Sequence, residues 1–140
     1  MKLSESEIES KAEKLLKTSG VEGIYPVPLV PIAESLGYKL EQFTPTKPET
    51  AQISGMVEYA KASILVNSQE PAVRKRFTIA HEFGHIQLHG DRHNYIDYRS
   101  SIMNLDADGS VREAEADAFA AALLMPEKNF EKFYLNLKII

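Results

Sequence analysis

The spacing of apolar residues in the N-terminal part of the chain predicts two helices. Between residues 4 and 20, apolar residues recur at helical spacing, Ser4 and Glu7 form a capping-box pair, and a glycine ends the segment. A shorter helix is expected over residues 30–36, where Gly37 terminates it. We expect the first helix to pack through its apolar stripe. This stripe consists of Ile8, Ala12, Leu15 and Leu16.

Three strands are expected to follow. Residues 38–43 alternate apolar and polar side chains over most of their length, as a strand with one buried face does. Residues 53–59 and 63–67 are close enough to form a hairpin. Residues 44–50 carry two prolines and are predicted to form a surface loop. The sheet is therefore expected to be small and antiparallel.

A long buried helix is predicted after the sheet, ending at Gly90. Its apolar residues spread over most of the circumference, which is typical of a helix surrounded by other elements. Asn67 or Ser68 can cap its start, and Pro71 suits its first turn. Its apolar positions are Val73, Phe77, Ala80, Phe83, Gly84 and Ile86.

Two further helices complete the predicted architecture. One is expected over residues 111–125, after a segment without clear period whose acidic run, residues 106–109, forms a turn that caps the helix. An amphipathic helix is expected near the C-terminus. Together the elements predict an α+β fold, in which a small antiparallel sheet of about three strands packs on the long buried helix, with additional N- and C-terminal helices. The C-terminal apolar positions are Phe130, Phe133, Tyr134 and Leu137.

Composition limits the classes of protein to consider. With 140 residues, 44% of them hydrophobic, residues 1–140 are expected to form a single domain around one core. The chain has no apolar run of about 20 residues and no apolar signal-peptide region, so a cytoplasmic location without membrane attachment is expected. The net charge of −4 gives no overall attraction to nucleic acid. Without cysteine, a metal site must use His, Asp and Glu.

The long helix carries a His-Glu-x-x-His motif. Because positions four apart share a helix face, His81 and His85 can present two imidazole nitrogens to one ion. A catalytic zinc site has this kind of ligand and leaves one position for water. Glu82, rotated about 100° from His81, can take a proton from that water. The motif predicts one zinc ion, although such ligands also suit manganese or iron.

The third ligand is expected on the next helix. Glu113 and Asp117 lie four apart among alanines, so Glu113 can bind the metal while Asp117 accepts a hydrogen bond from a ligand histidine. Glu115 points elsewhere. Glu113 also suits a capping box begun by Ser110, and the residues alone leave both roles open.

Other polar residues lie near the motif in the sequence. His89 continues the spacing of four, but about 12 Å of helix rise separates it from His81, so we expect a helix-end residue favoured by the helix dipole. His93, Tyr95 and Tyr98 are candidates for binding the carbonyl oxygen in the transition state.

Two motifs occur in order along the chain. Residues 76–85, preceded by Asn67 and Pro71, contain the histidine motif, and Glu113-x-x-x-Asp117 is followed by Leu-Leu-Met-Pro at residues 123–126. Together they resemble the ImmA/IrrE family of zinc metallopeptidases, over roughly residues 28–126. The resemblance implies that His81, His85 and Glu113 are zinc ligands and that Glu82 is the catalytic base.

The resemblance also implies a biological role. Members of this family cleave, or promote removal of, XRE-type helix-turn-helix repressors, often in mobile elements, prophages or stress-response operons. A zinc metallo-endopeptidase that acts in transcriptional regulation is therefore expected, and a substrate strand is expected to pair along residues 53–59. The alternatives are a zinc-binding module that regulates a partner by contact without proteolysis, and a helix that binds no metal.

Overall fold

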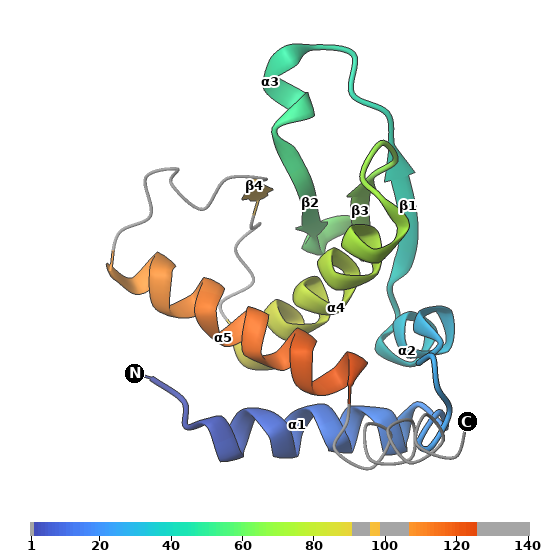
Figure 1. The fold of residues 1–140 in the computed structure, drawn as a ribbon, viewed down its shortest axis with the longest axis vertical. Helices are drawn as coiled ribbons and strands as arrows, with labels where there is room; N and C mark the ends of the chain where they lie inside the picture. The colour runs from blue at the N-terminus through green and yellow to red at the C-terminus, as the bar shows by residue number, and fades with distance from the viewer. Residues whose placement is uncertain (1, 91–95, 99–106, 126–140) are drawn as a thin grey trace, which may run out of the picture.

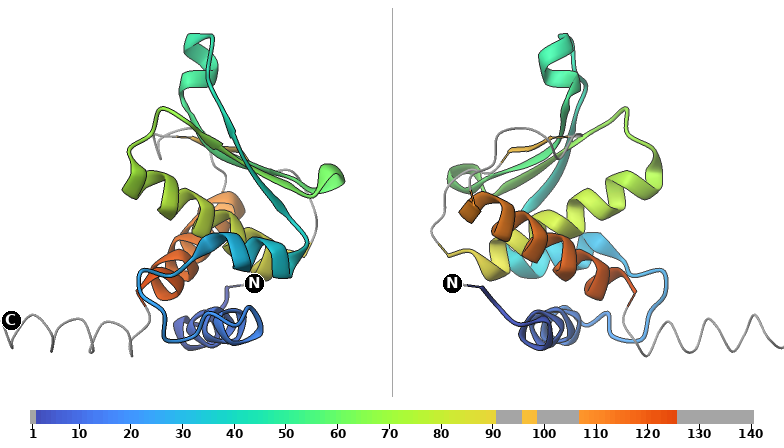
Figure 2. Two further views of the ribbon diagram at one scale, coloured as in Figure 1. Left: turned by 90° about the vertical axis from the view of Figure 1, so that its right-hand side faces the viewer. Right: turned by 60° about the vertical axis from the view of Figure 1, so that its left-hand side comes forward.

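The described part of the chain forms a four-stranded sheet covered on one side by helices (Figure 1). The computed structural model describes residues 2–90, 96–98 and 107–125. In Figure 2 the sheet, then α4, and finally α1 follow one another from top to bottom. The elements are α1 (Glu5–Thr18), α2 (Leu29–Leu36), β1 (Lys39–Phe43), α3 (Pro48–Ala51), β2 (Ile53–Glu58), a 3-10 turn (Tyr59–Lys61), β3 (Ser63–Asn67), α4 (Ala72–Leu88), β4 (Ile96–Tyr98) and α5 (Ala107–Leu124).

The sheet confirms the predicted hairpin but is mixed rather than antiparallel. Its strand order is β1-β3-β2-β4, with β2 antiparallel to β3 and β1 parallel to β3. The chain leaves β1 through α3 and enters β2 on the far side of β3, so β1 and β3 run in the same direction. The α+β class is confirmed. The sequence pattern identifies the strands but not which strands pair, which is why the expectation of an antiparallel sheet was wrong for β1.

The short strand β4 occupies the edge of β2 where a substrate strand was expected to pair. It pairs antiparallel with β2, where Ile53 lies opposite Tyr98 and Met56 lies opposite Ile96. Because β2 is hydrogen-bonded to β3 and β4, its expected exposed edge is covered over this stretch. Pairing of a substrate strand along β2 is therefore excluded there, and β4 and β1 form the edges of the described sheet.

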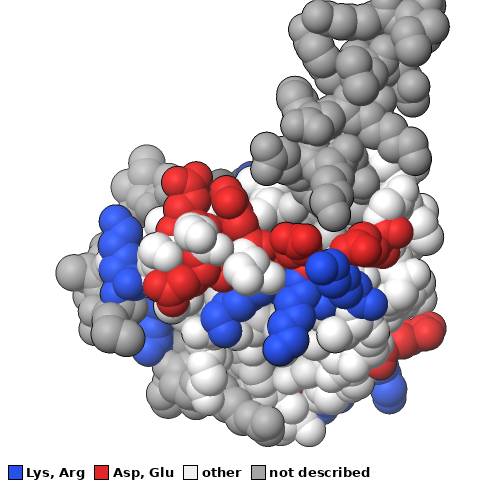
Figure 3. Space-filling view, turned by 90° about the horizontal axis from the view of Figure 1, so that it is seen from below, with Lys and Arg blue, Asp and Glu red and all other residues white. Residues whose placement is uncertain are grey.

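The first helix forms as predicted. The Ser4 hydroxyl accepts a hydrogen bond from the Glu7 backbone N–H at 3.1 Å and donates to Glu7 Oε1 at 3.0 Å, which fixes the start of α1. The predicted apolar stripe is buried and α1 packs on α5. Acidic and basic side chains form a band across the face seen from below (Figure 3), as expected for the solvated side of an amphipathic helix.

Several predicted boundaries differ from the structure. The loop of residues 44–50 includes the start of α3, because Pro48 suits a first helical position. Asn67 does not cap α4: its side chain accepts from the Gln69 N–H and donates to the Ile53 carbonyl, which closes a turn. Val73 is 81% exposed, in contrast to the predicted burial. The predicted C-terminal helix lies outside the described residues.

The second long helix begins earlier than predicted. Because α5 starts at Ala107, residues 107–110 lie within the helix rather than in a turn that caps it. Ser110 is therefore not an N-cap, and Glu113 does not occupy the N3 position of a capping box. Each helix in the described part of the chain is too short or too polar to span a membrane.

Helix α4 is the centre of the packing. Its buried residues contact α5 on one side and strands β2 and β3 on another. Gly84 allows the close approach of α5, because a Cβ at this position would lie 3.1 Å from Ala116 Cα and 3.2 Å from Phe119 Cβ. Among the described residues, the largest fully buried apolar side chains are Phe83, Phe119, Ile32, Ile64 and Leu123.

Gly55 has the corresponding role on the sheet side of α4. A Cβ at Gly55 would lie 2.5 Å from Thr78 Cγ2 and 2.9 Å from the Leu65 carbonyl oxygen. Both distances are shorter than ordinary carbon contacts, which lie near 3.5–4.0 Å. If this position gains a side chain, Thr78 must therefore shift, and so must β2 relative to the backbone of β3.

We predict that Gly55→Ala lowers the free energy of unfolding by about 1–3 kcal/mol, because the extra methyl group overfills the contact between α4 and the sheet. Gly90→Ala is the matched control, since no described atom lies within 4 Å of its added Cβ. The control should change stability by less than about 1 kcal/mol. Urea unfolding of both variants tests this, and equal stabilities would contradict the packing argument.

Candidate metal centre

Three side chains from two helices converge at the crossing of α4 and α5. The Nε2 atoms of His81 and His85 lie 3.1 Å apart. Glu113 Oε2 lies 2.9 Å from His81 Nε2, and Glu113 Oε1 lies 3.0 Å from His85 Nε2. Both histidines are buried, and Glu113 is partly exposed. The structure therefore brings together the two motifs that are separated in the sequence.

The arrangement of these atoms fits one metal ion. Tetrahedral zinc with bonds of about 2.0–2.1 Å keeps its ligand atoms about 3.3 Å apart. The three side chains offer ligand atoms within 4.8 Å of one another, and the closest approaches are only a few tenths of an ångström below the tetrahedral spacing. Two imidazoles and one carboxylate are a ligand set that zinc accepts, and manganese or iron also suits it.

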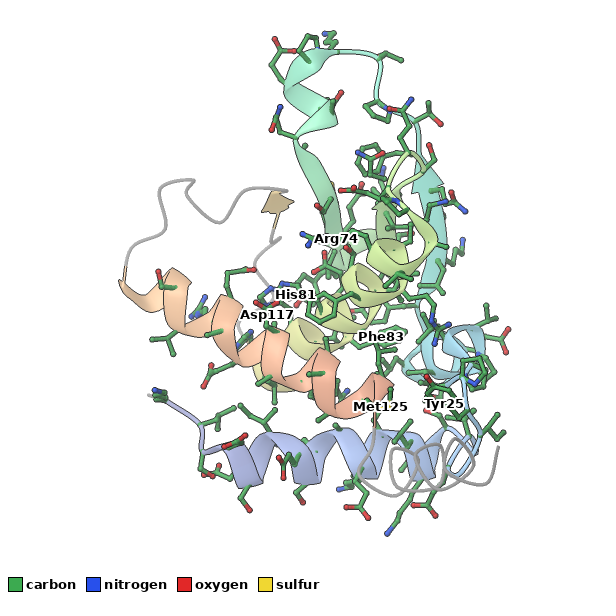
Figure 4. All side chains as sticks on the ribbon, in the orientation of Figure 1. Tyr25, Arg74, His81, Phe83, Asp117 and Met125 are labelled. Atoms are coloured by element: carbon green, nitrogen blue, oxygen red, sulfur yellow. The ribbon has the colours of Figure 1, made fainter. Side chains whose placement is uncertain are left out.

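Asp117 forms a hydrogen bond with the first histidine. Its Oδ1 lies 2.7 Å from His81 Nδ1, and Figure 4 shows the two side chains facing one another between α4 and α5. An ionised carboxylate can only accept hydrogen bonds, so the proton belongs on Nδ1 of His81. In the neutral ring, Nε2 then keeps a lone pair directed toward His85 and Glu113. Asp117 thus occupies the position expected for a partner of a metal-binding histidine.

A second set of contacts, which the sequence did not reveal, lies behind His85. His89 is the C-cap residue of α4 and is buried, with Nδ1 2.9 Å from His85 Nδ1. Its Nε2 lies 3.0 Å from Oε1 of the buried Glu115, and Glu115 Oε2 accepts the Leu3 backbone N–H at 2.7 Å. The same spacing of four that pairs His81 with His85 also pairs His85 with His89. Helical spacing could therefore have predicted this contact.

The pKa values of His89 and Glu115 are both lowered, with different effects on the charge of each group. Burial lowers the pKa of His89, despite the opposing hydrogen bond to Glu115, so this imidazole is neutral near pH 7. Burial alone would raise the pKa of Glu115, but the hydrogen bonds from the Leu3 N–H and His89 outweigh it and lower the pKa. Glu115 is therefore a carboxylate at neutral pH, beside an uncharged imidazole.

Glu82 lies on another side of α4 from the partners on α5. Its side chain is fully buried, and a Cβ at Gly55 would lie 3.3 Å from Glu82 Oε2. The carboxylate therefore packs against β2, next in sequence to His81. Glu82 is therefore enclosed between α4 and the sheet.

The candidates for transition-state stabilisation are not placed. His93 and Tyr95 lie outside the described residues. Tyr98 ends β4 opposite Ile53, and its side chain is not described. Their role stays a prediction.

Comparison with known proteins identifies a related family. The family model described as Peptidase_M78, the IrrE N-terminal-like domain, matches residues 33–139. The match includes α4 and α5, and therefore every side chain that converges at the helix crossing. A comparison with curated proteins found no significant match.

We predict that the purified protein binds one zinc ion per chain and that Glu113→Gln weakens zinc binding at least about 100-fold, since even outer partners of zinc ligands contribute about 10–100-fold. Competition with a chromophoric chelator measures the affinity. Glu49→Gln, the same change at an exposed position of α3, should bind zinc like the wild type. Equal affinity of the two variants would exclude Glu113 as a ligand.

Proposed function

The chain belongs to the IrrE N-terminal-like peptidase family, and we propose that it is a zinc metallo-endopeptidase that hydrolyses peptide bonds in a regulatory protein. The observation that carries this proposal is the convergence of His81, His85 and Glu113, with Glu82 next to the first ligand in the sequence. This arrangement supplies a three-ligand metal site and a carboxylate base on one helix pair.

The ligand set assigns a role to each group. His81 and His85 would hold zinc through Nε2, and Glu113 would hold it through its carboxylate. A zinc ion at these ligands would supply a Lewis acid for the scissile carbonyl and would bring the pKa of its water toward about 7. Asp117 keeps the His81 ring in the tautomer and orientation that binding needs.

Glu82 is the proposed general base. It accepts a proton from the attacking water as the oxygen bonds to the carbonyl carbon, and then gives this proton to the departing amide nitrogen. The proton is thus conserved within one cycle, and the carboxylate is regenerated. Packing of Glu82 against β2 near Gly55 holds it in place for both transfers.

The proposed substrate is an XRE-type helix-turn-helix repressor. Membership of the family supports a protein substrate, and the resemblance of the two motifs supports this class of regulator. Cleavage would remove the repressor from its operator and so change transcription, which fits a role in the cytoplasm and in the control of mobile elements. Because β2 is paired on both sides, a bound peptide must use another edge of the sheet or side-chain contacts.

We predict that Glu82→Gln retains zinc but lowers the rate of cleavage by about 100-fold or more, because an amide cannot accept the proton. The variant and the wild type are incubated with the XRE-type regulator encoded nearest to the protein and with a mixture of unfolded peptides. Mass spectrometry then detects new termini.

The Glu49→Gln variant controls for the substitution itself and should cleave like the wild type. New termini at equal rates with Glu82→Gln would contradict the assignment of the base. Relief of repression by zinc-loaded Glu82→Gln without cleavage would instead identify a module that acts by contact.

A further inference from the structure

A chain of hydrogen bonds connects one candidate ligand to the N-terminal segment of the protein. It runs from His85 to His89 at the end of α4, then to Glu115 on α5, and ends at the backbone N–H of Leu3 before α1. In Figure 1 the blue segment that enters α1 lies on the same side of the molecule as the beginning of α5. Three parts of the sequence, far apart from one another, therefore meet behind His85.

The direction of each hydrogen bond follows from the carboxylate at the end. Glu115 can only accept, so it receives the Leu3 N–H at Oε2 and the N–H of His89 Nε2 at Oε1. A neutral imidazole has a single N–H, which leaves Nδ1 of His89 as an acceptor. The contact of 2.9 Å between the two Nδ1 atoms then requires that His85 donates.

The consequence appears at the other nitrogen of His85. When Nδ1 carries the proton, Nε2 presents a lone pair, and this atom faces His81 Nε2 at 3.1 Å and Glu113 Oε1 at 3.0 Å. We propose that His89 and Glu115 are positioning residues that hold His85 in its metal-binding tautomer, and that the backbone N–H of Leu3 anchors them. This inference rests on the proposed metal site.

The hydrogen-bonded residues behind His85 are more deeply buried than Asp117, the partner of His81. The Asp117 side chain is 58% exposed, so water can take its place beside His81. The side chains of His89 and Glu115 are each only 6% exposed, and His85 is fully buried. A missing member therefore leaves an unsatisfied polar group in the interior, which is more costly than a loss at the surface.

Glu115→Gln tests the direction of the chain with little change in shape. An amide offers one acceptor oxygen and one NH₂ donor, so it cannot accept from both Leu3 and His89. If the NH₂ group faces His89, the donors reverse along the chain and His85 Nε2 receives the proton. If the oxygen faces His89, the Leu3 N–H loses its acceptor.

The first experiment measures zinc affinity by chelator competition. We expect zinc binding to weaken about 10–100-fold in Glu115→Gln and in His89→Phe, the range found for partners of metal ligands. Asp117→Asn should weaken binding less, because its side chain is exposed. Affinities of both buried-site variants equal to the wild type, with native folding by circular dichroism, would overturn the proposal.

The second experiment uses the backbone at residue 3. Leu3→Pro and Leu3→Ala both remove the leucine side chain, but only proline also removes the N–H that Glu115 accepts. We expect zinc binding of the proline variant to be several-fold weaker than that of the alanine variant. Equal affinities would exclude Leu3 as the anchor.

A spectroscopic measurement separates this inference from the metal site itself. In ¹⁵N-labelled protein without zinc at pH 8, we expect a scalar coupling between the Nδ1 nuclei of His85 and His89, with the proton bonded to His85. Failure of the wild type to bind zinc would reject the proposed function, whatever this spectrum shows. A proton bonded to His89 Nδ1 would contradict the proposed direction of these hydrogen bonds, even in a protein that binds zinc.

Discussion

The close crossing of α4 and α5 is the constraint on which the candidate site depends. At Gly84 the two backbones are so near that a single methyl group would lie 3.1 Å from Ala116 Cα. His85 follows this glycine directly, and Glu113 lies three residues before the facing alanine. The separation of imidazole and carboxylate is therefore set by packed backbone, which deforms less readily than a surface side chain.

The two sides of α4 have different chemical roles. Toward α5 it presents the candidate ligands, whose second nitrogens are held by Asp117 and by the buried pair of His89 and Glu115. Toward the sheet it presents Glu82, which packs against β2 where a glycine makes room. The sheet packs against the candidate base, Glu82. The segment that enters α1 contacts Glu115, which is hydrogen-bonded to His89 behind the candidate ligand His85.

The sequence predicted the features that depend on the local spacing of residues along the chain. The stripe of α1, the hairpin and the nearness of His81 to His85 follow from local spacing, and spacing on α5 put Glu113 and Asp117 on one face. The parallel pairing of β1 and the contacts of Glu115 depend on how distant elements cross. His89 was set aside because it is too far from His81 to share an ion, but that distance does not prevent it from orienting His85.

The central claim is that two imidazoles and the Glu113 carboxylate surround a single ion. X-ray absorption at the zinc edge of the zinc-loaded protein tests this claim most directly. The structure predicts a four-coordinate ion with two imidazole nitrogens and oxygen ligands at about 2.0–2.2 Å. A coordination sphere with fewer than two imidazoles, or one unchanged when Glu113 is replaced by glutamine, would contradict it.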